Sequence, residues 1–134
     1  MKAIVQRVTE ASVEGEGESV AAIGPGLLVL LGVARGDSSE QADRMAARLL
    51  ALRIFDGRSV TDVGGEILCV SQFTLLGDTR RGNRPSYTAA APAEEAQPLY
   101  ERVVEALGAQ GGRFGAHMTV SLVNDGPVTL ALES

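Results

Sequence analysis

The apolar run at residues 27–33, LLVLLGV, constrains the fold more than any other stretch of this sequence. A strand with one solvated face alternates apolar and polar side chains, but this run has no polar position. Gly24, Pro25 and Gly26 precede it and end the element before it. The run therefore predicts a strand at the centre of a sheet, with side chains covered on both faces.

The segment after this run changes to the helical period. Ser38, with Gln41 three residues on, forms a capping-box pattern. Apolar side chains then recur at three- and four-residue spacing, and charged side chains occupy the opposite face. The pattern predicts an amphipathic helix from Ser39 to about Arg53.

A second helical pattern lies between Pro92 and Gly108. Glu94 and Glu95 occupy its first turn, where carboxylates interact favourably with a helix N-terminus, and Gly108 ends it. Pro98 lies beyond the first turn, where its ring removes a backbone hydrogen bond. We therefore expect the regular helix to begin only near Pro98.

The other apolar stretches have strand lengths. They lie at residues 3–8, 12–13, 20–23, 67–75, 118–123 and 128–132. With the run at 27–33 they give five to seven strands beside two helices. The sequence predicts an α+β fold in which two helices pack on a mixed sheet or a partly closed β-barrel. A length of 134 residues is typical of one domain, so we expect a single domain over residues 1–134.

Composition limits the partners and the location. The net charge is −5 and the pI is near 4.8, so the protein as a whole does not attract nucleic acid. The apolar runs are too short to span a bilayer, and the first residues lack the apolar segment of a secretory signal. Cys69, the single cysteine, cannot form an intramolecular disulfide, and we expect it to pack in the core. We expect a cytoplasmic location and no membrane partner.

The residue types that common hydrolytic and metal-dependent mechanisms use are scarce. His117 is the single histidine and has no cysteine or acidic partner at metal-ligand spacing, so we expect no metal site and no cofactor. A lone histidine at a strand edge is more often a surface residue than a catalytic one. The sequence also lacks a G-x-S-x-G elbow, a Walker loop and a dinucleotide fingerprint.

A polar cluster at the end of the stretch at 67–75 is the main candidate for chemistry. Ser71 and Thr74 carry hydroxyls that act as nucleophiles when a base lies beside them, but the sequence offers no such base. Backbone N–H groups in this cluster are the alternative, because they stabilise an oxyanion without an ionisable side chain. The simplest interpretation is a strand that leaves the core.

Two further stretches carry unusual residues. Gly126 directly before Pro127 marks a constrained turn between two predicted strands. Arg80, Arg81 and Arg84 concentrate positive charge in one short loop. Such a loop is either a solvated surface or a local contact for RNA.

Seven stretches together resemble the D-aminoacyl-tRNA deacylase family of bacteria and eukaryotes. They lie at residues 1–8 with 11–13, 26–33, 53–55, 71–75 (SQFTL), 84–87, 112–116 and 124–129 (NDGPVT). Each stretch alone is weak support, but their order and spacing along the whole chain are specific. SQFTL and NDGPVT match the two signature motifs of the family.

The resemblance implies the fold of that family and a homodimer with its active site at the subunit interface. The enzyme would cleave the ester bond between a D-amino acid, or glycine, and the terminal ribose of tRNA. Its partners would be D-aminoacyl-tRNA and glycyl-tRNA. The implied catalytic residues are Ser71, Gln72, Phe73 and Thr74, whose backbone amides include those that hold the ester and its oxyanion. The family mechanism assigns activation to the ribose 2′-hydroxyl, so Thr74 would position the substrate.

The resemblance also assigns the substrate-binding residues. Gly126 and Pro127 of one subunit, joined by a cis bond, would reach the partner's SQFTL segment and direct their carbonyl oxygens at the substrate's amino group. Arg7 matches the arginine that holds this pair, and Met118, with Phe73, matches a position near the terminal adenosine. The tRNA contacts are expected at Arg80, Arg81 and Arg84.

The chain departs from the family between Phe55 and Gly64, where it is shorter than most relatives, and at His117, where aspartate is common. Two other functions remain open. One is a non-catalytic RNA-binding module, which the acidic pI disfavours. The other is a hydrolase of small esters or free D-amino-acid derivatives that uses Thr74 directly.

Overall fold

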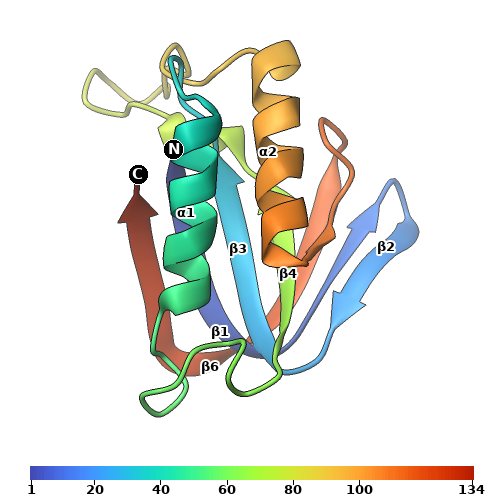
Figure 1. Ribbon diagram of the computed structural model, residues 1–134. Helices are drawn as coiled ribbons and strands as arrows, with labels where there is room; N and C mark the ends of the chain where they lie inside the picture. The colour runs from blue at the N-terminus through green and yellow to red at the C-terminus, as the bar shows by residue number, and fades with distance from the viewer.

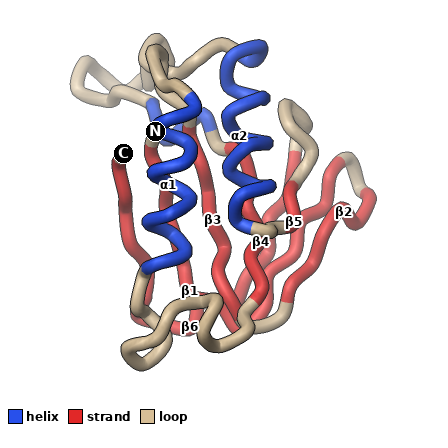
Figure 2. Tube along the Cα trace, viewed as in Figure 1, coloured by secondary structure: helices blue, strands red, loops and turns tan.

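The computed structural model describes residues 1–134 as a six-stranded sheet, two α-helices and one short 3₁₀ helix (Figure 1). The elements are β1 (Lys2–Gly15), β2 (Glu18–Ile23), β3 (Gly26–Gly32), α1 (Ser39–Ala51), β4 (Glu66–Ser71), the 3₁₀ helix η1 (Phe73–Leu76), α2 (Ala93–Leu107), β5 (Gln110–Gly111) and β6 (Met118–Glu133). Figure 2 shows both α-helices on the same face of the sheet. Neither α-helix has the length and apolar character needed to cross a membrane.

The sheet is mixed and has β3 in its interior. Its strands follow the order β2-β1-β3-β4-β5, and β6 pairs with β1. β3 pairs with β1 in antiparallel orientation and with β4 in parallel orientation, and all of its residues except Leu30 are buried. This confirms the prediction from the apolar run.

Both faces of β3 are covered because the sheet curls into a nearly closed barrel. Leu27 and Val29 belong to the larger core, which lies under the helices and includes Met45 of α1. Leu28 points the other way and packs with Leu68 in a second core. The predicted α+β class, with two helices on a mixed, partly closed sheet, is therefore confirmed.

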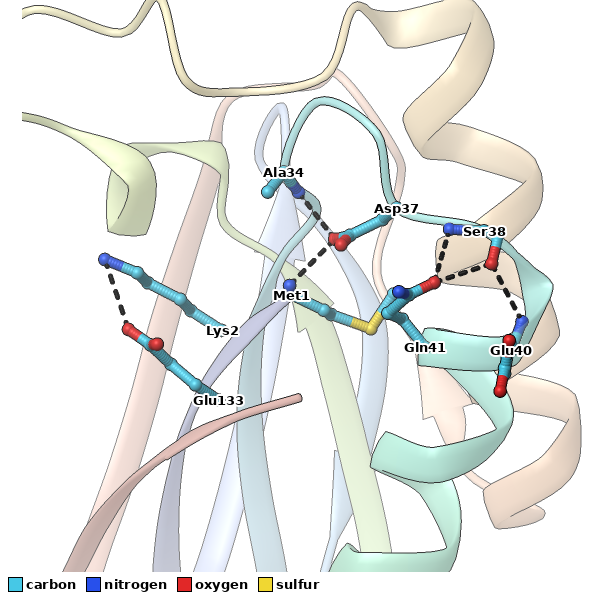
Figure 3. Close-up of polar contacts among 8 residues, drawn as sticks. All are labelled: Met1, Lys2, Ala34, Asp37, Ser38, Glu40, Gln41 and Glu133. Carbon is cyan, nitrogen blue, oxygen red and sulfur yellow. Dashed lines mark hydrogen bonds and ion pairs between the residues drawn. The ribbon is translucent and has the colours of Figure 1, made fainter.

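α1 begins where the capping box predicts. The Ser38 N–H donates to Gln41 Oε1 at 2.8 Å, and the Glu40 N–H donates to Ser38 Oγ at 3.3 Å (Figure 3). The helix ends at Ala51, slightly before the expected limit near Arg53.

Asp37, just before this cap, ties the start of β1 to the start of α1. Its Oδ2 accepts a hydrogen bond from the Ala34 N–H at 2.8 Å and lies 2.8 Å from the α-ammonium of Met1 (Figure 3). Met1 is buried and the Asp37 side chain is only 9% exposed, so each charge depends largely on the other for its solvation.

The expectation that α2 begins near Pro98 is wrong. α2 begins at Ala93, and the Glu95 N–H already donates to the Pro92 carbonyl at 3.0 Å. Pro98 and Glu94 both lie on the exposed face of the helix. Because Pro98 has no N–H, the Glu94 carbonyl loses its helical donor. Water can bond that carbonyl, which removes most of the cost of the proline.

Several strand boundaries also differ from the predictions. β1 is one strand, not two pieces at 3–8 and 12–13, and β6 is one strand, not two strands joined by a turn. The two long strands pair along nearly their whole length, and shifts in register absorb the extra residues of β6. β4 ends at Ser71, so the predicted strand at 67–75 instead closes with η1. The short strand β5 has no counterpart in the predictions.

Candidate active site

A cavity of about 550 Å³ lies at the carboxyl end of β4. Ser71, Gln72 and Phe73 form part of its wall, and His117 and Met118, at the start of β6, form another part. Apolar side chains from the start of α2 and from residues 114–116 complete most of the lining. The structure therefore brings four of the sequence-predicted site residues together, while Thr74 lies just outside the lining.

The backbone at this cavity offers two free donors. The Gln72 N–H donates to the Leu31 carbonyl at 2.7 Å, so it cannot also hold a substrate oxyanion. Phe73 and Thr74 open η1, and the first N–H groups of a helix have no acceptor within it. The Gln72 side chain does not cap them either. Among the predicted amides, those of Phe73 and Thr74 thus have no acceptor within the helix, whereas that of Gln72 is already bonded.

The Thr74 hydroxyl has a neighbour but no base. Its Oγ1 accepts a hydrogen bond from Gln72 Nε2, and no histidine or carboxylate bonds to it. A threonine nucleophile needs a group that takes its proton. The local geometry therefore favours a positioning role for Thr74.

No group of three or more His, Cys, Asp or Glu side chains has an arrangement that could hold a metal ion.

The NDGPVT stretch forms a wide bulge in β6. Val8 pairs with Asn124 and Gln6 pairs with Thr129, so the four residues at 125–128 oppose one residue of β1. The Asn124 side chain closes the base of the bulge by donating to the Arg7 carbonyl at 2.9 Å and to the Val128 carbonyl at 3.1 Å. The bulge contains Gly126 and Pro127, whose peptide bond is cis, as the resemblance implies.

Arg7 holds this bulge from the opposing strand. Its Nη1 donates to the Ile54 carbonyl at 2.5 Å, and its Nε donates to the Asp125 carbonyl at 3.2 Å. The same Nε lies 3.1 Å from Asp125 Oδ2. Ile54 precedes a tight turn in which Asp56 and Gly57 both have positive φ, the pattern of a type I′ turn. The segment after α1 thus supplies one of the three contacts that fix Arg7.

The bulge and the cavity lie at opposite ends of the sheet. Arg7 pairs with Leu27, whereas Ser71 pairs with Leu31, a separation of about 13 Å along the strands. β6 and β4 are also separated by β1 and β3, which adds about 14 Å across the sheet. Figure 1 shows the bend of β6 at the lower edge and the carboxyl ends of β3 and β4 at the upper edge. Gly126 and Pro127 therefore do not reach the cavity of their own chain.

The three predicted tRNA-contact arginines are not equivalent. Asp78 and Ser86 exchange backbone hydrogen bonds of 2.7 and 2.9 Å and close the loop that carries them. Arg80 makes a two-pronged contact with the Asp78 carboxylate, at 3.0 and 2.7 Å. These hydrogen bonds lower the pKa of Asp78 to about 2. Arg81 and Arg84 make no ion pair within the chain, so they carry the uncompensated positive charge of the loop.

Two other ionisable groups near the cavity are structural. Burial raises the pKa of the Cys69 thiol to about 12, which makes it unreactive. The Tyr100 hydroxyl donates to the Cys69 carbonyl at 2.7 Å and accepts from the Gly112 N–H at 3.1 Å. This buried hydroxyl connects α2 with β4 and with the segment that leads to the cavity wall.

The sequence assigns no role to Asn124 or Tyr87, although both lie in stretches that resemble the family. Asn124 lies within the NDGPVT stretch, but only the register of β6 against β1 shows that its side chain closes the bulge. Tyr87 follows the arginine loop, and its ring lies 5.2 Å from the ring of Phe73 in an edge-to-face arrangement. The available signal was an aromatic residue directly after a basic cluster.

Comparison with known proteins identifies relatives along the whole chain. A family model described as D-Tyr-tRNA(Tyr) deacylase matches residues 4–133. A D-aminoacyl-tRNA deacylase of Thermosipho africanus is 52% identical over 145 positions, which cover 100% of this chain and 97% of the relative. The one from Kineococcus radiotolerans is 53% identical over 141 positions and 100% of both chains. Both alignments are longer than 134 residues, so this chain lacks some positions that its relatives have.

Solved structures share the fold of this chain over nearly its whole length. A structure described as c-Myc DNA Unwinding Element Binding Protein has a TM-score of 0.93 and 44% identity, over 100% of this chain and 99% of that chain. A second, described as a probable eukaryotic D-amino acid tRNA deacylase, has a TM-score of 0.84 over 99% of this chain and 98% of that chain. Its identity is 17%, so this second likeness shows the fold alone.

Proposed function

Because this chain belongs to the D-Tyr-tRNA(Tyr) deacylase family, we propose that it is a D-aminoacyl-tRNA deacylase. It hydrolyses the ester bond between a D-amino acid and the 3′-terminal ribose of tRNA and thereby removes wrongly charged tRNA. The observation that carries this proposal is the cavity at the end of β4, in which Phe73 and Met118 form an apolar wall beside the N–H groups that open η1. We place this activity in the cytoplasm, in agreement with a single cysteine that is buried as a free thiol.

In the proposed reaction, water attacks the carbonyl carbon of the ester, and the carbonyl oxygen becomes an oxyanion. The N–H groups of Phe73 and Thr74 bind that oxyanion. The bond to the ribose oxygen then breaks, the ribose oxygen takes a proton, and a free D-amino acid leaves. The absence of a base beside Thr74 supports the view that the neighbouring ribose 2′-hydroxyl moves the proton.

Gly126 and Pro127 act as the chirality filter in this proposal. Their carbonyl oxygens accept hydrogen bonds from the substrate's amino group, and the backbone occupies the space that an L side chain would need. A backbone clamp has no rotamer that can move aside, so it rejects the L substrate by steric exclusion. Glycine has no side chain, so glycyl-tRNA is expected to be a substrate as well.

In this proposal the filter belongs to a second copy of the chain, which agrees with the distance of the bulge from the cavity of its own chain. β6 supports a homodimer, since it is paired on one side only and exposes apolar side chains such as Val123, which is 49% exposed. An exposed apolar edge strand of this length associates with another surface unless it is protected. Val123→Asp should give a monomer by sedimentation and abolish deacylation. An active monomer at the assay concentration would contradict the shared site.

The central test compares D-tyrosyl-tRNA and L-tyrosyl-tRNA with the purified protein. We expect release of D-tyrosine and persistence of the L ester, and equal rates on both would refute chiral selection. A tRNA with a terminal 2′-deoxyribose tests the proton route, because full activity on it would exclude assistance by the 2′-hydroxyl. Hydrolysis of small D-amino-acid esters without hydrolysis of the charged tRNA would favour the alternative that uses Thr74 directly.

A further inference from the structure

We propose that Tyr87 is the stacking platform for the base that precedes the terminal adenosine of the tRNA. This inference rests on the proposed function and extends it from the terminal nucleotide to the next one. It adds a binding residue that the family motifs do not assign.

Tyr87 lies directly beside the wall of the cavity. Its ring centroid is 5.2 Å from that of Phe73, which lines the cavity. Both residues are unusually open to solvent for large aromatics, at 56% exposed for Phe73 and 40% for Tyr87. Large aromatic side chains that remain this exposed offer faces to which a nucleic-acid base can bind.

Tyr87 also directly follows the loop that carries Arg80, Arg81 and Arg84. The backbone pairing of Asp78 with Ser86 closes the arginine loop, and Tyr87 is the next residue along the chain. Arg81 and Arg84, which make no ion pair, extend from that loop. Sites for single-stranded nucleic acid combine aromatic stacking surfaces with positive charge along the backbone. The cavity with Phe73 therefore matches the terminal nucleotide, and Tyr87 matches the nucleotide before it. The arginines match the phosphates of the two.

The angle between the two rings fits a turned-out terminal nucleotide. The ring planes of Phe73 and Tyr87 make an angle of 69°. Two successive bases, one on each ring, are then splayed apart and not stacked on each other. Such a splayed end presents the ester to the cavity while the preceding base remains held outside it.

The test is a cycle that removes the ring and the base separately. D-tyrosyl-tRNA is compared with the same tRNA carrying an abasic nucleotide before the terminal adenosine, which keeps the sugar and phosphate. For the wild type, KM should rise about 5- to 150-fold on the abasic substrate, the range for stacking of one base. Tyr87→Ala should show that higher KM on both substrates, with kcat near the wild-type value, because stacking contributes equally before and during the reaction.

Two further variants separate stacking from packing. Tyr87→Phe keeps the ring and should behave as the wild type. Tyr87→Leu keeps side-chain bulk beside Gly77, where the Tyr87 ring leaves no room for a side chain, and should behave as Tyr87→Ala. Two results would overturn this inference but not the proposed function. One is that the rises in KM from removing the ring and from removing the base multiply in the combined case, and the other is that the wild type has the same KM on the abasic substrate. A wild type that does not deacylate normal D-tyrosyl-tRNA would overturn the proposed function and this inference with it.

Discussion

Replacement of Arg7 tests how the β6 bulge is held in place. The guanidinium connects two segments that are distant in sequence, the Ile54 carbonyl after α1 and Asp125 in the bulge. Its side chain is only 19% exposed, so water screens these contacts less than it would at the surface. In Arg7→Ala all three contacts disappear while the β1 ladder stays intact.

The expected loss of stability follows from the three contacts. The short bond to Ile54 is a charged donor on a neutral carbonyl, worth about 1.5–3 kcal/mol. The longer bond to the Asp125 carbonyl is worth about 1 kcal/mol, and its half-exposed carboxylate adds at most about 1 kcal/mol. Water replaces part of these bonds, so we expect a loss of about 2–4 kcal/mol, or about 10 °C in Tm for a chain of this size.

Urea unfolding at fixed protein concentration measures this loss, and parallel deacylation assays measure the ratio of D to L cleavage. Arg7→Ala should lower that ratio, because a looser bulge lets the filter yield to an L side chain. Arg7→Lys should fall between the wild type and Arg7→Ala, since an ammonium cannot reproduce the planar fork. The matched control is Arg58→Ala, an exposed arginine in the turn after Ile54 that should change stability by less than about 0.5 kcal/mol. A loss in Arg7→Ala no larger than in this control would refute the proposed brace.

Three other expectations concern stability, reactivity and charge. Tyr100→Phe should cost about 2–4 kcal/mol in urea unfolding, because it leaves the buried Cys69 carbonyl and a backbone N–H without partners. The Cys69 thiol, with a pKa raised to about 12, should not react with a thiol reagent at pH 8 until urea unfolds the protein, and rapid reaction of the folded protein would contradict its burial. Arg81→Gln and Arg84→Gln should each reduce the slope of log KM against log salt concentration by about 1, whereas Arg80→Gln should reduce it less because a carboxylate already neutralises Arg80.

The parts of the fold that the sequence predicts are those with one dominant local cause. The run around Leu28 has no polar position, and only a strand buried on both faces satisfies it. Ser38 and Gln41 cap α1 by bonds within four residues, which need no tertiary context. The first turn of α2, before Pro98, is not predicted, because it depends on the solvent exposure of one carbonyl, and exposure is a tertiary property.

The parts that the sequence does not predict depend on pairing between distant strands. Gly126 and Pro127 predict a break in a strand, because a proline has no N–H for the ladder. In the structure β6 continues as one strand, because β1 pairs with it on both sides of the break. The side chains of Asn124 and Arg7 supply the hydrogen bonds that the ladder loses there. Similarly, the sequence predicts that SQFTL continues the strand. In the structure Gln72 makes the last bond to Leu31, and η1 then directs Leu76 into the core.

The candidate site is difficult to predict from residue types because its groups belong to the backbone. The proposed oxyanion donors are the N–H groups of Phe73 and Thr74, and the proposed filter is the carbonyl pair of Gly126 and Pro127. Side chains matter here mainly by fixing those atoms, as Arg7 does. Because the filter and the cavity lie at opposite ends of one sheet, a single chain holds the two halves of the proposed site without joining them. Under the proposed mechanism chiral selection requires dimer formation, so a change that separates the subunits should remove selectivity together with catalysis.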